Sequence, residues 1–149
     1  MHKITHCISS FNNLNYLKLA VKSVRENSYY KDAPFIIHTE NSVDGTNEWL
    51  KENSEKWNFD YYIEDNDNPI GIGGGMNFCA ERVKTEFINF LHADFYVSKY
   101  WDIELLKMFD KYPDEKLMVF SHRIQPDIFG DENRPGTVFV PLNEFGEFH

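Results

Sequence analysis

The sequence predicts an α/β fold, a mostly parallel sheet flanked by helices in one domain that spans residues 1–149. Short apolar runs alternate with longer segments whose apolar residues recur every three or four positions. Four such strand-then-helix units follow one another, and this alternation is the pattern of a parallel sheet with helices on both faces. Polar clusters directly follow four of the predicted strands, at the edge where such sheets bind ligands.

The first half of the chain contains two of these units. The apolar run 4–8 is short enough for a buried strand, and it is followed by a helix over 12–27 with Leu14, Leu17, Val21 and Val24 on one face. Pro34 precedes a second strand at 35–38. A helix then begins near residue 46 and places Trp49 and Leu50 toward the core.

The second half continues the alternation. A third strand is predicted at 59–63, and the glycine-rich segment 71–75 is expected to be a loop that leads into a helix beginning at Asn77. The apolar run 87–91 predicts a fourth strand, 101–112 a helix, and 117–120 a fifth strand. The tail 125–149 holds three prolines and is expected to be irregular apart from a short strand at 137–140.

Composition and charge exclude several classes of partner. The 149 residues carry a net charge of −9, which argues against nucleic acid and against an anionic membrane surface. No apolar stretch of about 18 residues exists, so no membrane span is predicted. Cys7 and Cys79 lack CxxC spacing and are interpreted as reduced packing residues of a cytoplasmic protein. A phosphorylated ligand would need backbone amides, a few local cations or a divalent metal.

The polar clusters at the strand ends predict one binding site. Any one of them would pass as an ordinary polar loop, but four on one rim of the sheet are expected to converge. They comprise Ser9-Ser10-Phe11-Asn12, Thr39-Glu40-Asn41-Ser42, Asn68 with the glycine segment, and His92-Ala93-Asp94.

These clusters resemble the motifs of glycosyltransferase family 2, which has the GT-A fold. Residues 8–12 resemble the family's first strand end, and 39–46 resemble its Asp-Asn-Ser-x-Asp-Gly-Thr motif. Residues 68–77 resemble the Asn-x-Gly-Phe-Gly-Gly-Gly-x-Asn segment of rhamnosyltransferase-like members, and 90–94 stand in place of the Asp-x-Asp motif. Residues 14–29 match the family's helix with its apolar-Ser-apolar step, here at 21–24. The resemblance covers about 4–109, with these five motifs in the right order.

The resemblance implies an inverting, metal-dependent hexosyltransferase of polysaccharide biosynthesis. Such an enzyme transfers a sugar from a UDP-, GDP- or dTDP-sugar to a glycan or lipid-linked acceptor. The alternative is a nucleotide-sugar-binding module that is catalytically incomplete. A dinucleotide-binding loop fits poorly, because the third glycine of its G-x-G-x-x-G motif would fall at Met76.

The resemblance also implies roles for individual residues. Asp94 is expected to bind Mn²⁺ or Mg²⁺, with His92 where the family has its first acid, and Glu40 is expected to contact the base edge. Glycines would let the backbone approach the diphosphate closely. The expected nucleotide-sugar-binding residues are Ser9, Ser10, Phe11, Asn12, Glu40, Asn68, Gly71, Gly74, Gly75, Asn77, His92 and Ala93.

The family's catalytic base and acceptor-binding part lie far beyond its metal motif, and this chain ends 55 residues after Asp94. We therefore expect a donor-binding part without the C-terminal acceptor part. The catalytic base is not identified: Asp127 and Asp131 are candidates beside Glu132, but none of the three lies in a recognisable base motif. The strands at 117–120 and 137–140 would then leave an uncovered sheet edge, which predicts a homo-oligomer.

Overall fold

The computed structural model describes residues 3–113, 117–119, 123–126 and 137–140. The chain divides into two compact units, Met1–Trp101 and Asp102–His149, and each is described by itself. The single domain expected over residues 1–149 therefore stays a prediction.

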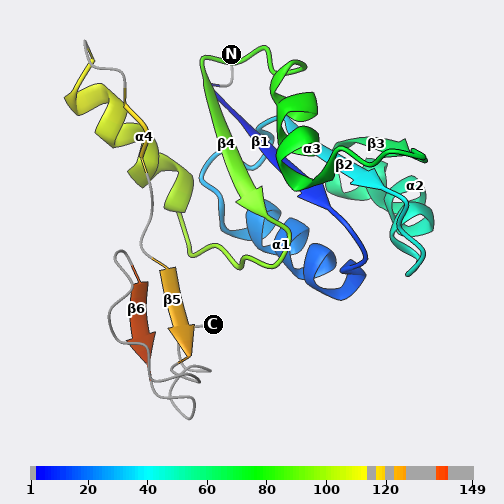
Figure 1. Ribbon diagram of the computed structural model, residues 1–149. Helices are drawn as coiled ribbons and strands as arrows, with labels where there is room; N and C mark the ends of the chain where they lie inside the picture. The colour runs from blue at the N-terminus through cyan, green and yellow to red at the C-terminus, as the bar shows by residue number, and fades with distance from the viewer. Residues whose placement is uncertain (1–2, 114–116, 120–122, 127–136, 141–149) are drawn as a thin grey trace. The chain divides into compact units, whose positions relative to one another are not determined.

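The first unit is built on a four-stranded sheet (Figure 1). Its strands are β1 (Ile4–Ser10), β2 (Phe35–Glu40), β3 (Asp60–Glu64) and β4 (Phe87–His92), in the spatial order β3-β2-β1-β4. All three pairings are parallel, which confirms the α/β prediction. Every residue of β1 and β2 is buried, so these two strands form the middle of the core.

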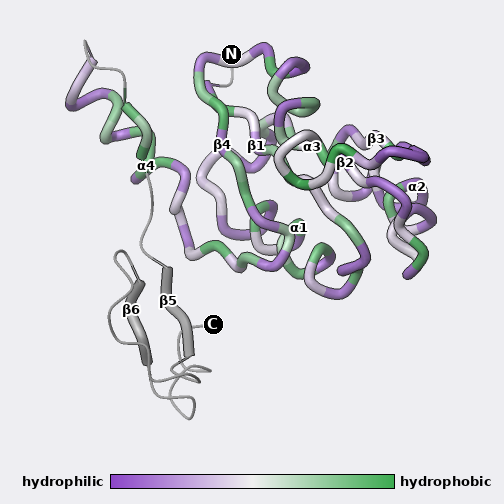
Figure 2. The backbone as a smooth tube through the Cα atoms, viewed as in Figure 1, coloured by the Kyte–Doolittle hydropathy of each residue, from purple (hydrophilic) through white to green (hydrophobic). Residues whose placement is uncertain are grey.

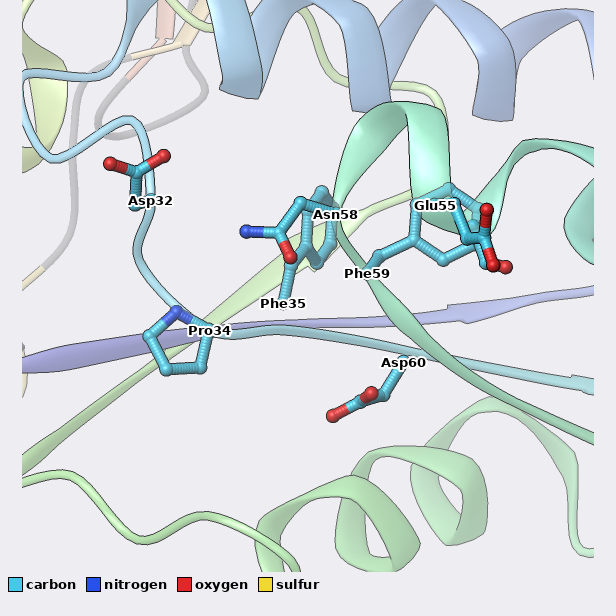
Figure 3. Close-up of a pocket in the computed structure, with 8 residues that line it drawn as sticks. Asp32, Pro34, Phe35, Glu55, Asn58, Phe59 and Asp60 are labelled. Carbon is cyan, nitrogen blue, oxygen red and sulfur yellow. The ribbon is translucent and has the colours of Figure 1, made fainter.

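Three helices connect the strands: α1 (Leu14–Asn27), α2 (Thr46–Trp57) and α3 (Gly71–Ala80). In Figure 2 the segment between β3 and α3 has hydrophilic colours, as its sequence of acidic and amide residues requires. Figure 3 views the strands from the side, with α1 and α2 on one face of the sheet and α3 on the other. The predicted helices on both faces are confirmed.

Successive side chains of a strand point to opposite faces of the sheet, so each face packs its own group of apolar residues against the helices. On the α3 face, Cys7 and Ile36 pack with Cys79 of the helix. On the opposite face Phe35 lies edge-on to Phe59, whose ring stacks against Trp49 at a centroid distance of 5.8 Å. The site therefore rests on strands that are buried on both faces.

The second unit begins within the first turn of helix α4 (Trp101–Lys111) and contains the rest of that helix. The predicted fifth strand at 117–120 is wrong where it can be compared, because 117–119 form no regular element, while Phe120 lies outside the described residues. An apolar run becomes a strand only when a neighbour accepts its backbone hydrogen bonds. Here β5 (Arg123–Pro126) pairs in parallel with β6 (Thr137–Val140) instead. The short strand predicted at 137–140 is confirmed as β6, whereas β5 was not predicted.

No helix within the described residues is long and apolar enough to cross a membrane.

Candidate functional site

The carboxyl ends of the four parallel strands form one rim, which we define as residues 9–12, 38–44, 64–75 and 92–94. The register places Ser9 beside His38 on one side and His92 on the other. Ser10 lies beside Thr39, and Glu40 beside Glu64. The clusters after β1, β2 and β4 therefore meet, as expected for a parallel sheet, and the glycine segment joins them through the bonds from Ile70 and Gly71 to Glu40.

The loops after β1 and β2 are fastened to each other at this rim. The backbone N–H of Asn12 donates to the Ser42 hydroxyl at 3.2 Å, and the Asn12 side chain accepts from the Val43 N–H at 2.8 Å. Asn12 and Asn41 both have left-handed backbones, with φ of 47° and 46°, a conformation that asparagine adopts more readily than most residues. Asn12 thus holds the two loops at a fixed separation.

Asp44 caps two helices at once. Its Oδ2 accepts from the Leu14 N–H at the start of α1 (2.8 Å), and its Oδ1 accepts from the Thr46 N–H and hydroxyl at the start of α2. Burial raises the pKa of this carboxyl, but the bonds from Thr46 and Leu14 outweigh burial and hold the pKa below its ordinary value. The carboxylate is the form that binds both helix N-termini.

We predict that Asp44→Ala lowers the free energy of unfolding by about 1–3 kcal/mol, because two helix N-termini lose their acceptor. Chemical denaturation measures this loss. Asp44→Asn should lose less, since its single amide oxygen still caps one helix. Equal stability of Asp44→Ala and the wild type would show that the double cap contributes nothing.

The glycine segment differs from its prediction. It forms the first half of α3, which begins at Gly71, so Asn77 lies inside the helix and does not start it. The predicted loop was wrong because the low helix propensity of glycine is overcome here by tertiary contacts at the start and the middle of the helix.

Glu40 supplies the contact at the start of α3. Its Oε1 accepts from the Ile70 N–H and its Oε2 from the Gly71 N–H, both at 2.9 Å. The Asn66 amide donates to Oε1 at 3.1 Å, while the Asn66 backbone exchanges two 2.9 Å bonds with the Asn41 side chain. The anion at this helix N-terminus is therefore a side chain of the protein itself.

The charge state of Glu40 follows from these bonds. Burial raises its pKa, but the Ile70 N–H, the Asn66 amide, the Gly71 N–H and the nearby His38 together hold the pKa below its ordinary value. A carboxyl whose pKa falls on folding stabilises the fold at neutral pH, and this contribution is lost as the pH drops through the lowered pKa. Glu40 is therefore a carboxylate at neutral pH.

Gly75 supplies the contact in the middle of α3. A Cβ built on Gly75 would lie 2.2 Å from the Ser9 Oγ and 2.6 Å from the His38 Nδ1. A Cβ on Gly73 would meet nothing within 4 Å. Gly75 thus lets the helix backbone touch the sheet, whereas the space over Gly73 is open.

The end of β4 carries the predicted metal residues. His92 is exposed and its ring lies 5.1 Å from that of Phe95, while Ala93 is buried. Asp94 is exposed. Within the part of the chain that the structure describes, no hydrogen bond or ion pair engages its carboxylate. Asp94 is therefore available to an outside cation.

A second group of potential metal ligands lies on the neighbouring strands. One ligand atom each of His38, Glu40 and Glu64 falls within 4.8 Å of the others. The His38 Nε2 bonds to the Glu64 Oε2 at 3.0 Å and both oxygens of Glu40 hold the start of α3, whereas the His38 Nδ1 has no hydrogen-bond partner among the described residues and lies against Gly75. A cation there would have to displace these bonds, so Asp94 is the better candidate.

The remaining predicted site residues differ in their exposure to solvent. Ser9 and Ser10 are buried at the rim, Phe11 is 57% exposed, and Asn68 is exposed in the segment before α3. Asp127 and Asp131 lie outside the described residues. Sequence reasoning missed Asn66, Glu64 and the double cap at Asp44. Strand alternation could have found Glu64, because it occupies the same face of the sheet as Glu40.

A separate pocket lies at the opposite end of the sheet, where β2 and β3 begin (Figure 3). Its volume is about 470 Å³. The carboxylates of Asp32, Glu55 and Asp60 line it and would repel a diphosphate. The pocket is lined by Asp32, Pro34, Phe35, Ser54, Glu55, Asn58, Phe59 and Asp60.

Comparison with known proteins adds two findings. The sequence profile described as Glycosyl transferase family 2 matches residues 5–146, well beyond the 4–109 expected from the motifs. No curated protein is similar enough in sequence to count as a match.

Solved structures share the fold. S. aureus TarS 1–349 in complex with UDP-GlcNAc has a TM-score of 0.66 and 16% identity over 84% of this chain and 35% of that chain. Mannosyltransferase PcManGT from Pyrobaculum calidifontis, in complex with GDP-Man and Mn²⁺, has a TM-score of 0.57 and 14% identity over 83% of this chain and 34% of that chain. The chain therefore spans about a third of the length of these two solved chains, and 21% of a longer solved chain of S. aureus TarS.

Proposed function

Because the chain belongs to glycosyltransferase family 2, we propose that the rim binds a nucleoside-diphosphate sugar and serves sugar transfer to an acceptor. The observation that carries the proposal is the convergence of the four predicted clusters on one rim. The solved complexes of similar fold with UDP-GlcNAc and with GDP-Man and Mn²⁺ support a donor of this class.

The residues present fit a divalent cation at Asp94. Its carboxylate is exposed and unengaged among the described residues, and an oxygen ligand suits Mn²⁺ and Mg²⁺. We propose His92, two residues earlier, as a second ligand. A bound cation would neutralise the diphosphate as it leaves the sugar. The need is strong in a protein of net charge −9.

The nucleotide is proposed to lie over the rim, with its diphosphate near the open space at Gly73. Ser9, Ser10, Phe11, Asn12, Asn68 and Ala93 would border it. The anion site at the start of α3 is filled by Glu40, so the diphosphate is not expected there. The proposed inverting outcome and rhamnosyltransferase-like subgroup rest on the resemblance, whereas the proposed homo-oligomer rests on the expected uncovered sheet edge. Two free cysteines support a reducing, cytoplasmic location.

The experiment that tests transfer is release of sugar from UDP-, GDP- and dTDP-sugars with Mn²⁺, with and without simple glycan acceptors. Turnover of one donor by this chain would support an enzyme. Tight, saturable donor binding without any turnover would favour the nucleotide-sugar-binding module instead.

We predict that Glu40→Gln changes the affinity ranking of UDP, GDP and dTDP. In the structure Oε2 accepts one bond, from Gly71, and a carboxylate oxygen can accept two, which leaves one acceptor for a base N–H. The amide would also fail to accept from both Ile70 and Gly71, so the free energy of unfolding should fall by about 1–3 kcal/mol. Calorimetric titration and chemical denaturation measure the two effects.

Glu64→Gln is the matched control, because it removes the same charge from the adjacent register position and keeps an oxygen for His38. It should leave the ranking of the three nucleotides unchanged. If Glu40→Gln is destabilised but ranks the nucleotides as the wild type does, Glu40 only holds α3 and does not contact the base.

A further inference from the structure

The two cysteines of the chain meet at the interface between β1 and α3. Cys7 and Cys79 are both fully buried and belong to one packed cluster with Ile36. Both side chains lie in the core between β1 and α3, on the face of the sheet that the helix covers. The Cys79 thiol lies 3.9 Å from the Ile8 carbonyl oxygen, to which it donates. Two thiols that pack in one small buried cluster need little movement to form a disulfide.

The helix that covers this pair is weak on its own. Four of the ten residues of α3 are glycines, and each costs about 1 kcal/mol relative to alanine in a helix interior. The helix is held at its start by the Glu40 carboxylate and in its middle by the Gly75 contact. Local opening of such a helix requires less free energy than global unfolding, and it gives a small oxidant access to the buried sulfurs.

We propose that Cys7 and Cys79 form a reversible oxidation site, in which a peroxide converts the two thiols into a disulfide that fastens α3 to β1. This proposal concerns the fold of the first unit and does not depend on the proposed function.

The two thiols have different roles. The hydrogen bond from Cys7 lowers the pKa of the Cys79 thiol, burial opposes this, and nearby Arg82 adds to the lowering. The contact with Cys79 and burial raise the pKa of Cys7. Cys79 is therefore the sulfur that reacts first, since the thiolate is the nucleophile.

The reaction balances with hydrogen peroxide as the oxidant. The Cys79 thiolate attacks one peroxide oxygen, an S–O bond forms, the O–O bond breaks, and the leaving hydroxide takes a proton to become water. The Cys7 sulfur then attacks the sulfenic sulfur, an S–S bond forms, and the S–O bond breaks. The second hydroxide takes the Cys7 proton and leaves as water. Two thiols lose two electrons, and peroxide is reduced to two waters.

The disulfide would stabilise the protein, because it closes a long loop between residue 7 and residue 79. A cross-link over this loop lowers the conformational entropy of the unfolded chain. Dividing the resulting gain in stability by the usual entropy of unfolding gives a rise in Tm of roughly 8–15 °C. Dithiothreitol should reverse this rise.

The test treats the full chain with hydrogen peroxide, blocks the remaining thiols, and maps the peptides by mass spectrometry without reduction. We expect a Cys7–Cys79 linked peptide pair, lighter by two hydrogens than the sum of its two reduced peptides in the same methionine oxidation state, and the reversible rise in Tm. Cys79→Ala and Cys7→Ala, each a small buried replacement, should show no rise in Tm. Methionine oxidation in the same sample confirms exposure to peroxide.

Three results would overturn the proposal. The first is two unlinked thiols in wild-type protein whose methionines are oxidised. The second is a disulfide between two chains in place of the internal one. The third is a linked pair without any change in Tm, because a cross-link that leaves stability unchanged does not fasten α3 to β1.

Discussion

Gly75→Ala is expected to destabilise the first unit by about 1–3 kcal/mol or more, the usual cost of forcing an extra methyl group into a packed interior. The new Cβ would overlap the Ser9 Oγ and the His38 Nδ1, at 2.2 and 2.6 Å. Neither neighbour can move away easily, because His38 is fully buried and Ser9 lies in the fully buried β1. Thermal and chemical denaturation measure the loss.

Gly73→Ala is the matched control, two residues earlier in the same helix. Its Cβ has no neighbour within 4 Å, and alanine favours a helix over glycine by up to about 1 kcal/mol. This variant should be as stable as the wild type or more stable. If the two variants lose equal stability, the close contact between α3 and the sheet does not explain the glycine at 75.

Asp94→Ala is expected to weaken nucleoside diphosphate binding in Mn²⁺ by roughly 2–4 kcal/mol, by analogy with the loss of a charged partner at a buried pair. The physical reason is that the proposed cation loses its carboxylate ligand, and the diphosphate then faces a protein of net charge −9. Stability should change little, since the carboxylate is exposed. Titration calorimetry of the variant measures the affinity.

Glu52→Ala controls for charge, because Glu52 is an exposed residue in α2, away from the defined rim. It changes the net charge by the same amount and should leave the affinity unchanged. A loss of affinity in Glu52→Ala as large as that in Asp94→Ala would attribute the effect to overall charge.

Much of the first unit could be predicted because its signals are local. The apolar runs of β1 and β2 and the helical spacing of Leu17 and Val21 identify elements whose burial the structure confirms. The rim could also be predicted, because parallel strands must bring their carboxyl ends together.

The start of α3 could not be predicted from local signals. Glycine favours loops, and only the distant Glu40 carboxylate and the fit of Gly75 against Ser9 make the segment helical. The hydrogen bonds from Ile70 and Gly71 also give Glu40 a structural role, which the positions of these residues in the sequence do not reveal. The apolar run at 117–119 likewise looked like a strand, but strand formation depends on a partner that the sequence does not name.

The central claim, a nucleoside diphosphate held at the rim through a divalent cation, is tested most directly by titration calorimetry. UDP, GDP and dTDP are each titrated into the wild-type chain, once in Mn²⁺ and once in EDTA. The account predicts saturable binding of at least one nucleotide in Mn²⁺, and at least tenfold weaker binding in EDTA, the equivalent of roughly 1.4 kcal/mol. Equal affinity in the two buffers, or binding of none of the three nucleotides in Mn²⁺, would contradict it.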